Sequence, residues 1–234
     1  MSTETQEKNM KKILIVDGGP RRNMNTAALC DAFAEGARAA SPEIEVERIR
    51  LYDLPPFKGC MSCLACKLKG RATGLCAIRD GLTDTLHAVN EADGLVIASP
   101  IYFSEWTAMT RAFLERLVFP WLSYETFSCA APKKMPLAWL YTMNAPESMM
   151  PDIRQHLAIL EGAVARGVGD PAPAFVEAHS TVQVTDYSRY AMDGLQPAAH
   201  IAWRDAHWED DLAKARAAGQ AMAEKTLSGT QTTR

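Results

Sequence analysis

The chain has 234 residues, which is long enough for one large domain with a substantial core. Its hydrophobic fraction of 47% and charged fraction of 23% are typical of globular proteins, and a net charge of −3 gives no reason to expect nucleic acid or an anionic membrane as a partner. No apolar run in the sequence approaches the roughly 20 residues that span a bilayer.

The composition changes only towards the two ends of the chain. Both ends are polar, and the N-terminal one lacks the apolar segment of a signal peptide. We therefore expect flexible tails over residues 1–10 and 228–234, a single domain over residues 11–227, and a cytoplasmic location. The six cysteines are then mainly reduced, so that a cluster of them indicates metal or redox chemistry before disulfides.

The first predicted strand contains the unbroken apolar run Ile13–Val16, and the polar loop Gly18–Thr26 follows it. The spacing of apolar residues predicts a helix over Thr26–Ala40. A strand that leads through a polar loop to a helix start can bind an anion, because free N–H groups and the helix dipole both point outward there. An ordinary strand–helix turn with helix caps explains the local pattern equally well. The loop matches neither the dinucleotide-binding nor the P-loop motif.

Further strands and helices alternate along the rest of the chain. Strands are predicted over Ile44–Leu51, Gly94–Ser99, Leu137–Thr142 and Ala174–Ala178, and helices over Leu82–Glu91, Thr107–Phe119 with Pro120 as its end, Ile153–Arg166 and Asp205–Leu227. The segments 52–80 and 180–195 show no clear periodicity. Strands that alternate with helices predict a doubly wound parallel sheet of about five strands, an α/β fold.

Three loops follow the carboxyl ends of the strongest predicted strands. In doubly wound sheets, ligands bind beyond these ends, at the point where the strand order reverses. The loops Gly18–Thr26, Ser99–Trp106 and Thr142–Pro146 are therefore candidates for one site. The first offers donors for a phosphate, and the other two offer flat apolar surface beside backbone polar groups. A phosphorylated, planar aromatic ligand fits this combination, and FMN is the obvious candidate.

Four cysteines lie within the irregular segment 52–80, namely Cys60, Cys63, Cys66 and Cys76. The Cys-x2-Cys-x2-Cys run suits a [4Fe–4S] cluster, because short spacings let neighbouring sulfurs turn towards one cluster. The same four thiolates could hold Zn²⁺, or the loop could bind no metal. Cys30 and Cys129 are isolated, and we expect them to be inert thiols. The five histidines show neither metal-ligand nor catalytic-triad spacing.

Aromatic residues gather in and after the second of the three loops. An exposed patch of this kind is more than a monomer usually leaves to water, and closed symmetry is the common way to cover it. We therefore expect a homodimer or a homotetramer. The predicted patch consists of Tyr102, Phe103, Trp106, Phe119, Trp121 and Tyr124.

Gly18–Thr26 resembles the FMN-phosphate loop, GSPRxxxNT, of the NADPH-dependent FMN reductase and iron–sulfur flavoprotein families. Similar matches follow in Ala92–Phe103 for the second flavin loop, Met109–Arg116 for the next helix, Cys60–Cys66 with Cys76–Asp80 for the cysteine segment, and more weakly in Tyr141–Asn144 and Thr185–Ser188. The chain departs from these families in three places. Gly19 replaces the usual serine, Gly81 replaces a common second acid, and Cys76 follows Cys66 at a longer distance than usual.

The resemblance implies a flavodoxin-like fold with three α/β/α layers and FMN as cofactor. Phosphate contacts would come from the backbone N–H of Gly19 and from Arg21, Asn23, Asn25 and Thr26. The isoalloxazine would lie against Pro100, Ile101, Tyr102, Phe103 and Ser104, with Thr142, Met143 and Asn144 at its other edge.

The expected function is that of an FMN-dependent NAD(P)H oxidoreductase. Hydride from NAD(P)H would reach the flavin, and electrons would pass to a quinone, a flavin or another small acceptor, or singly through a cluster. The alternatives are a non-catalytic electron carrier that is reduced by a ferredoxin-like protein, and a flavin-less scaffold stabilised by zinc. No side chain is expected to be catalytic itself, because the cofactor carries the chemistry.

Overall fold

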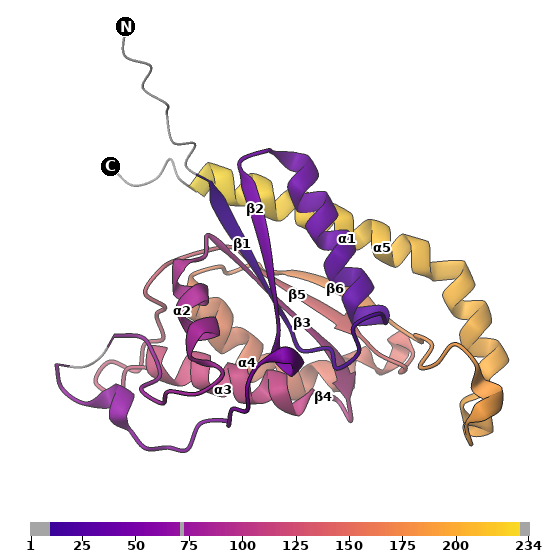
Figure 1. Ribbon diagram of the computed structural model, residues 1–234, viewed down its shortest axis with the longest axis horizontal. Coiled ribbons are helices and arrows are strands. Elements are labelled where there is room, and N and C mark those ends of the chain that lie inside the picture. The colour runs from indigo at the N-terminus through magenta and orange to yellow at the C-terminus, as the bar shows by residue number, and fades with distance from the viewer. Residues whose placement is uncertain (1–9, 71–72, 230–234) are drawn as a thin grey trace, which may run out of the picture.

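Five parallel strands form the central sheet of the computed structural model, which describes residues 10–70 and 73–229 (Figure 1). They are β1 (Lys11–Asp17), β2 (Ile44–Arg50), β3 (Gly94–Tyr102), β5 (Leu137–Thr142) and β6 (Ala174–Ala178). The strand order β2-β1-β3-β5-β6 reverses direction between β1 and β3, which confirms the predicted doubly wound sheet. The two-residue strand β4 (Glu105–Trp106) was not predicted and pairs antiparallel with the end of β3.

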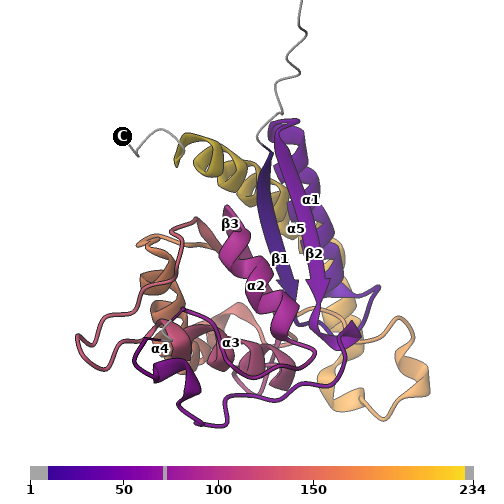
Figure 2. The same ribbon diagram turned by 60° about the vertical axis from the view of Figure 1, so that its left-hand side comes forward.

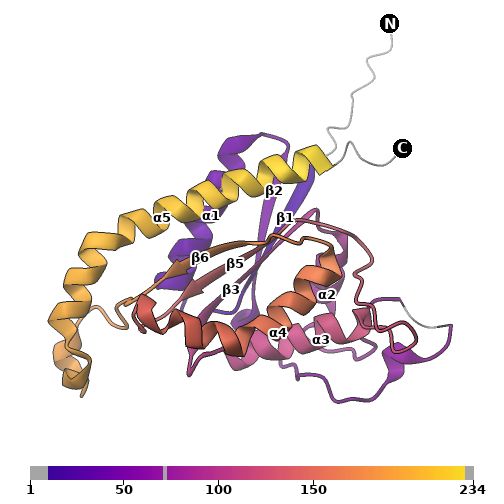
Figure 3. The ribbon, with the colours of Figure 1, turned by 180° about the vertical axis from the view of Figure 1, so that it is seen from behind.

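Helices cover both faces of the sheet, which confirms the three-layer α/β/α arrangement. The first group is α1 (Asn25–Ala40) and α5 (Pro197–Ser228), and the second is α2 (Thr83–Glu91), α3 (Ala108–Trp121) and α4 (Met150–Val168). Figures 1 and 3 show α1 and α5 on one side of the sheet and α3 and α4 on the other. The 3₁₀ turns are η1 (Leu51–Asp53), η2 (Ala65–Lys67), η3 (Glu147–Met149), η4 (Tyr187–Arg189) and η5 (Asp193–Leu195).

Successive side chains of β1 enter two separate apolar cores. Leu14 and Val16 belong to the core beneath α2, α3 and α4, while Ile13 and Ile15 belong to the core beneath α1 and α5. All four are fully buried. A strand covered on both faces has no position that favours a polar side chain, which explains the unbroken apolar run in the sequence.

Several predicted helix ends were wrong. α3 continues through Pro120 to Trp121, and the ammonium of Lys67 binds the carbonyl oxygens of Phe119, Pro120 and Leu122 at its C-terminus. A proline so close to a helix end removes only one N–H, and the lysine stabilises the terminal carbonyl groups. α5 begins at Pro197 instead of Asp205, since proline is well tolerated in the first turn of a helix.

The predicted tails lie mostly outside the described residues, and Ser228 still belongs to α5. Among residues 10–70 and 73–229, none of the helices combines the length and apolar character that crossing a bilayer requires. The predicted aromatic patch is only partly at the surface. Trp106 and Trp121 are buried in the core, whereas Tyr102, Phe103 and Tyr124 are exposed.

Two glycines let α1 and α5 pack against each other at close range. A Cβ atom placed on Gly219 of α5 would lie 2.0 Å from the carbonyl oxygen of Phe33, and one on Gly36 of α1 would lie 2.0 Å from the carbonyl oxygen of Arg216. Both contacts are with backbone atoms, so a side chain at either position forces the helices apart.

We therefore expect Gly219→Ala to lower the free energy of unfolding by about 1–3 kcal/mol, because overpacking outweighs the gain in helix propensity. Gly162→Ala is the matched control, since Gly162 also lies within a helix but faces only the flexible Arg166 side chain at 3.2 Å. Its unfolding free energy should stay constant or rise by up to about 1 kcal/mol. Urea unfolding measures both, and equal effects would contradict the close helix contact.

Candidate functional site

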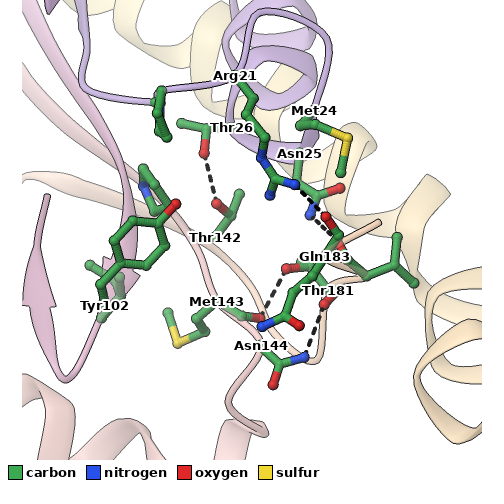
Figure 4. A pocket seen from close by; sticks show the side chains of 15 residues that line it. Arg21, Met24, Asn25, Thr26, Tyr102, Thr142, Met143, Asn144, Thr181 and Gln183 are labelled. Atoms are coloured by element: carbon green, nitrogen blue, oxygen red, sulfur yellow. Dashed lines mark hydrogen bonds between the residues drawn. The ribbon is translucent and has the colours of Figure 1, made fainter. Parts of the chain in front are cut away.

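A cavity lies at the carboxyl ends of β1, β3 and β5, where the strand order reverses (Figure 4). This is the place at which doubly wound sheets bind their ligands. Three predicted loops contribute to it, and a fourth segment after β6 joins them. The lining residues are Gly19, Pro20, Arg21, Met24, Asn25, Thr26, Pro100, Ile101, Tyr102, Thr142, Met143, Asn144, Thr181, Val182 and Gln183.

Most of the predicted FMN contacts therefore meet in one place, but three do not line the cavity. Asn23 is exposed beside it. Phe103 and Ser104 form the turn between β3 and β4, with φ angles of 53° and 64°. Positive φ at two central residues is typical of a tight hairpin turn, and here it leaves the Phe103 side chain fully exposed. The sequence suggested a longer loop and gave no sign of this hairpin.

The segment 181–183 was not predicted as part of the site. The Arg21 guanidinium donates a hydrogen bond to the Gln183 carbonyl oxygen, and the Asn25 amide donates one to the Val182 carbonyl oxygen at 2.8 Å. These contacts run across one side of the cavity, opposite Tyr102 (Figure 4). They narrow it to about 80 Å³, below the roughly 300–1,000 Å³ of most ligand pockets.

Asp17, at the end of β1, supports the first loop and was not among the predicted site residues. Its carboxylate is fully buried and accepts hydrogen bonds from the Gly19 N–H at 2.7 Å, Arg48 at 2.5 Å and Arg50 at 2.9 Å. The Gly19 N–H, which was expected to contact phosphate, is therefore already used. One signal was available: an acid ends a buried strand, and arginines two positions apart follow in the neighbouring strand.

The start of α1 is suited to an anion. Met24 is the N-cap residue, and among the described residues no side chain caps the helix by a hydrogen bond. The first turn also contains no acidic residue. Arg21 adds a positive charge, and the Thr26 hydroxyl lies 2.8 Å from the Thr142 hydroxyl. Free helix N–H groups with an arginine, an amide and a hydroxyl make a donor set that fits a phosphate group.

The N-terminus of α3 braces the same loop from the other side. The Thr107 hydroxyl donates a hydrogen bond to the Gly18 carbonyl oxygen at 2.9 Å and lies 2.9 Å from the Thr110 hydroxyl. A Cβ atom on Gly18 would lie only 1.7 Å from Thr110 Oγ1. Glycine is therefore required at position 18, because the loop and α3 are in direct contact.

The four clustered cysteines line a second, small cavity beside α3, together with Arg116 and Phe119. Figure 2 shows their segment passing from the end of β2 along the outer side of α3. The structure thus brings Cys60, Cys63, Cys66 and Cys76 together. In the described part of the chain, however, no three Cys, His, Asp or Glu side chains are arranged to hold a metal ion.

The other two cysteines behave as isolated thiols. Cys30 is fully buried, and burial holds the pKa of its thiol well above the usual value. Cys129 is half-buried, and burial also raises the pKa of its thiol. Neither thiol lines the cavity of the other four cysteines, and a buried thiol with a raised pKa is a poor nucleophile, which agrees with the expectation that both are inert.

The sequence matches the family described as NADPH-dependent FMN reductase over residues 11–169. An iron–sulfur flavoprotein from Archaeoglobus fulgidus is 30% identical over 105 residues, which are 45% of this chain and 48% of that protein. Another from Methanocaldococcus jannaschii is 33% identical over 106 residues, which are 45% of this chain and 51% of that protein. The matched part thus spans about half the length of these curated relatives.

Solved structures share the fold over most of the chain. An NAD(P)H:quinone oxidoreductase from Methanothermobacter marburgensis superimposes with a TM-score of 0.62 and 16% identity, over 90% of this chain and 96% of that one. An FMN-dependent NADH-azoreductase from Bacillus anthracis, solved in complex with FMN, gives a TM-score of 0.61 and 14% identity, over 91% of this chain and 100% of that one. At these identities the likeness shows the fold alone.

Proposed function

Since the chain belongs to the NADPH-dependent FMN reductase family, we propose that it is an FMN-dependent oxidoreductase that passes electrons from NAD(P)H to a quinone, a flavin or another small acceptor. The observation that carries this proposal is the donor set at the switch point of the sheet. There the uncapped start of α1, Arg21, Asn25 and Thr26 face the apolar and aromatic ends of β3 and β5 across one cavity.

Arg21, Asn25, Thr26 and the first N–H groups of α1 would hold the phosphate of FMN. Pro100, Ile101 and Tyr102 would lie against the ring system, and Thr142, Met143 and Asn144 would lie at its edge. Bound FMN would supply the two-electron chemistry of hydride acceptance. Arg21 and Asn25 would exchange their carbonyl partners at Gln183 and Val182 for phosphate oxygens, which releases the segment 181–183 and widens the cavity.

Anaerobic purification tests the proposal most directly. We expect a yellow protein that releases FMN on denaturation, with FMN and FAD separated by chromatography. FMN is expected because the cavity offers one phosphate-binding loop and the sequence has no dinucleotide-binding motif for an adenylate. Addition of NADPH or NADH should then bleach the flavin absorbance. Recovery of FAD, or of no flavin, would overturn the proposal.

Replacement of Arg21 by alanine is expected to weaken FMN binding by about 1.5–3 kcal/mol, the range for a hydrogen bond to a charged group. This corresponds to a rise of about 10- to 150-fold in Kd, measured by flavin fluorescence. Arg22→Ala is the matched control, because Arg22 is exposed and pairs with Asp53 outside the cavity. Its Kd should be unchanged, and an equal loss in both variants would mean that only the general positive charge matters.

A second candidate function is a non-catalytic iron–sulfur flavoprotein that receives electrons from a ferredoxin-like protein. It is favoured by the cavity that Cys60, Cys63, Cys66 and Cys76 share, and by the curated relatives, which are iron–sulfur flavoproteins. We propose that these cysteines are ligands of a [4Fe–4S] cluster. Analysis of iron, zinc and sulfide separates a cluster from a zinc site and from an empty loop. Flavin reduction by ferredoxin, but not by NAD(P)H, would identify the carrier.

We also propose that the protein is a homodimer or a homotetramer. Phe103 at the hairpin tip is fully exposed, and Tyr102, Tyr124 and Phe127 are more than 40% exposed. Such aromatic side chains are typical of interface cores. Light scattering at micromolar concentration should give at least twice the mass of one chain. A mass near 25.7 kDa would contradict this expectation.

A further inference from the structure

Arg116 of α3 is a buried arginine whose guanidinium faces the cysteine cavity. Its side chain has no exposed surface, although arginine is almost never fully buried unless it is paired. The guanidinium makes four contacts: Nη1 with Asp80 Oδ2 at 2.5 Å, Nη1 with the Lys58 carbonyl oxygen at 3.2 Å, Nη2 with the Ile78 carbonyl oxygen at 2.9 Å, and Nε with Cys76 Sγ at 3.2 Å.

These contacts join both ends of the cysteine segment to one point on α3. Lys58 precedes the first cysteine of the run, and Ile78 and Asp80 follow the last. Burial alone would raise the pKa of the Asp80 carboxyl, but the hydrogen bond from Arg116 holds it below its usual value. A planar guanidinium has five donors in a fixed fork, so it can hold several acceptors at once, which a lysine ammonium on a flexible stem does less well.

The contact with Cys76 goes beyond what anchoring requires. The Lys58, Ile78 and Asp80 acceptors already join the segment to α3, yet Nε–H points at a sulfur atom that lines the cavity. A neutral thiol is a weak acceptor, whereas a thiolate bound to a metal cluster carries negative charge and accepts a strong, charge-assisted hydrogen bond. Hydrogen bonds to the sulfurs of an iron–sulfur cluster are among the features that set its reduction potential.

We propose that Arg116 is the positioning residue of the cluster site: it fixes Cys76 as a ligand and, through its N–H···S hydrogen bond, raises the reduction potential of the cluster. This inference rests on the cluster proposed for Cys60, Cys63, Cys66 and Cys76. The direction follows from charge, because reduction makes the cluster more negative and a positive donor stabilises the reduced form more than the oxidised form.

The test compares Arg116→Gln, Arg116→Lys and the double variant Arg116→Gln/Asp80→Asn, in which no unpaired carboxylate remains. Arg216→Gln is the control, because Arg216 also lies on a helix but is 42% exposed and pairs with Glu35 of α1, away from the cysteine segment. Each protein is purified anaerobically with FMN bound. The molar ratios of iron and sulfide to FMN are measured, and iron retention is measured at increasing concentrations of a chelator. The reduction potential of the cluster is measured by a redox titration that is monitored by EPR.

We expect Arg116→Gln and the double variant to lose iron at a chelator concentration at least about tenfold lower than the unchanged protein, with FMN content preserved. In the cluster that remains, the ratio of reduced to oxidised form at a fixed potential should fall about tenfold, which is about 59 mV for one electron. Arg116→Lys should restore part of the potential but not the iron retention, and Arg216→Gln should change neither.

Other outcomes overturn the inference in distinguishable ways. If the unchanged protein contains neither iron nor sulfide, the proposed cluster itself is wrong, and the inference falls with it. If the unchanged protein holds a cluster and the Arg116 variants keep both its iron retention and its potential, only the inference is wrong. If iron retention falls but the potential stays constant, Arg116 is merely a structural anchor of the loop, and the proposal is overturned.

Discussion

Replacement of Asp17 by alanine is expected to lower the free energy of unfolding by about 3–5 kcal/mol, as when one partner of a buried ion pair is removed. The variant leaves Arg48 and Arg50 without their shared carboxylate and the Gly19 N–H without an acceptor. Because Gly19 lines the cavity, the first loop also loses its support, and FMN affinity should fall with stability. Urea unfolding and FMN titration measure the two effects.

Asp31 provides the matched control for this variant. It also pairs with Arg48, at 2.8 Å, but its side chain is 75% exposed. Exposed ion pairs contribute at most about 1 kcal/mol, so Asp31→Ala should have a small effect on stability and none on FMN binding. Asp17→Asn retains a hydrogen-bond acceptor for the Gly19 N–H, so its loss of unfolding free energy should lie between the losses of the two alanine variants. Equal stability of the Asp17 and Asp31 alanine variants would show that burial of Asp17 contributes little.

Replacement of one cysteine of the cysteine cavity is expected to remove the whole proposed cluster and not a part of it. Cys63→Ala removes one of the four thiolates that the proposed [4Fe–4S] cluster needs, so iron, sulfide and the brown absorbance expected of such a cluster should be lost together. FMN should remain bound, because the proposed phosphate-binding loop lies between β1 and α1, in a different part of the chain from the cysteine segment. Metal and sulfide analysis, absorption spectra and EPR of anaerobic protein measure these changes.

Cys129→Ala is the control for that experiment, since Cys129 is half-buried and does not line the cavity. Its cluster content should equal that of the unchanged protein. Retention of full iron and sulfide in Cys63→Ala would contradict the assignment of Cys63 as a ligand. Loss of FMN along with the cluster would instead show that the two sites depend on each other.

The main strands, the doubly wound class of the sheet and the position of the cavity could be predicted, because the strands show local apolar patterns and the cavity position follows from the class of sheet. Continuous apolar runs identified β1, β3 and β5, which are buried on both faces, and the ligand position in a doubly wound sheet follows from its topology. The same reasoning placed the loops Gly18–Thr26 and Thr142–Pro146 beside each other, and the family resemblance selected the site residues within them.

What could not be predicted depends on contacts between distant residues. Asp17 accepts hydrogen bonds from arginines more than 30 positions away in the sequence. Arg116 donates hydrogen bonds to acceptors that are 36 to 58 positions away. The segment 181–183 has no periodicity of its own and reaches the site only because β6 lies beside β5. Phe103 was misplaced for a different reason: a two-residue turn of left-handed backbone is unusual without glycine or asparagine.

Helix α3 contacts the loops of both candidate sites, and it sets the distance between the points at which these loops are anchored. Thr107 at its N-terminus holds the Gly18 carbonyl, and Arg116 holds the cysteine segment. At about 1.5 Å per residue, these two positions are roughly 14 Å apart along one continuous helix. The distance spanned by a loop changes as its backbone moves, whereas a hydrogen-bonded helix keeps an almost constant length. The two loops are therefore anchored at a nearly constant separation, so that motion of one loop does not shift the anchor point of the other.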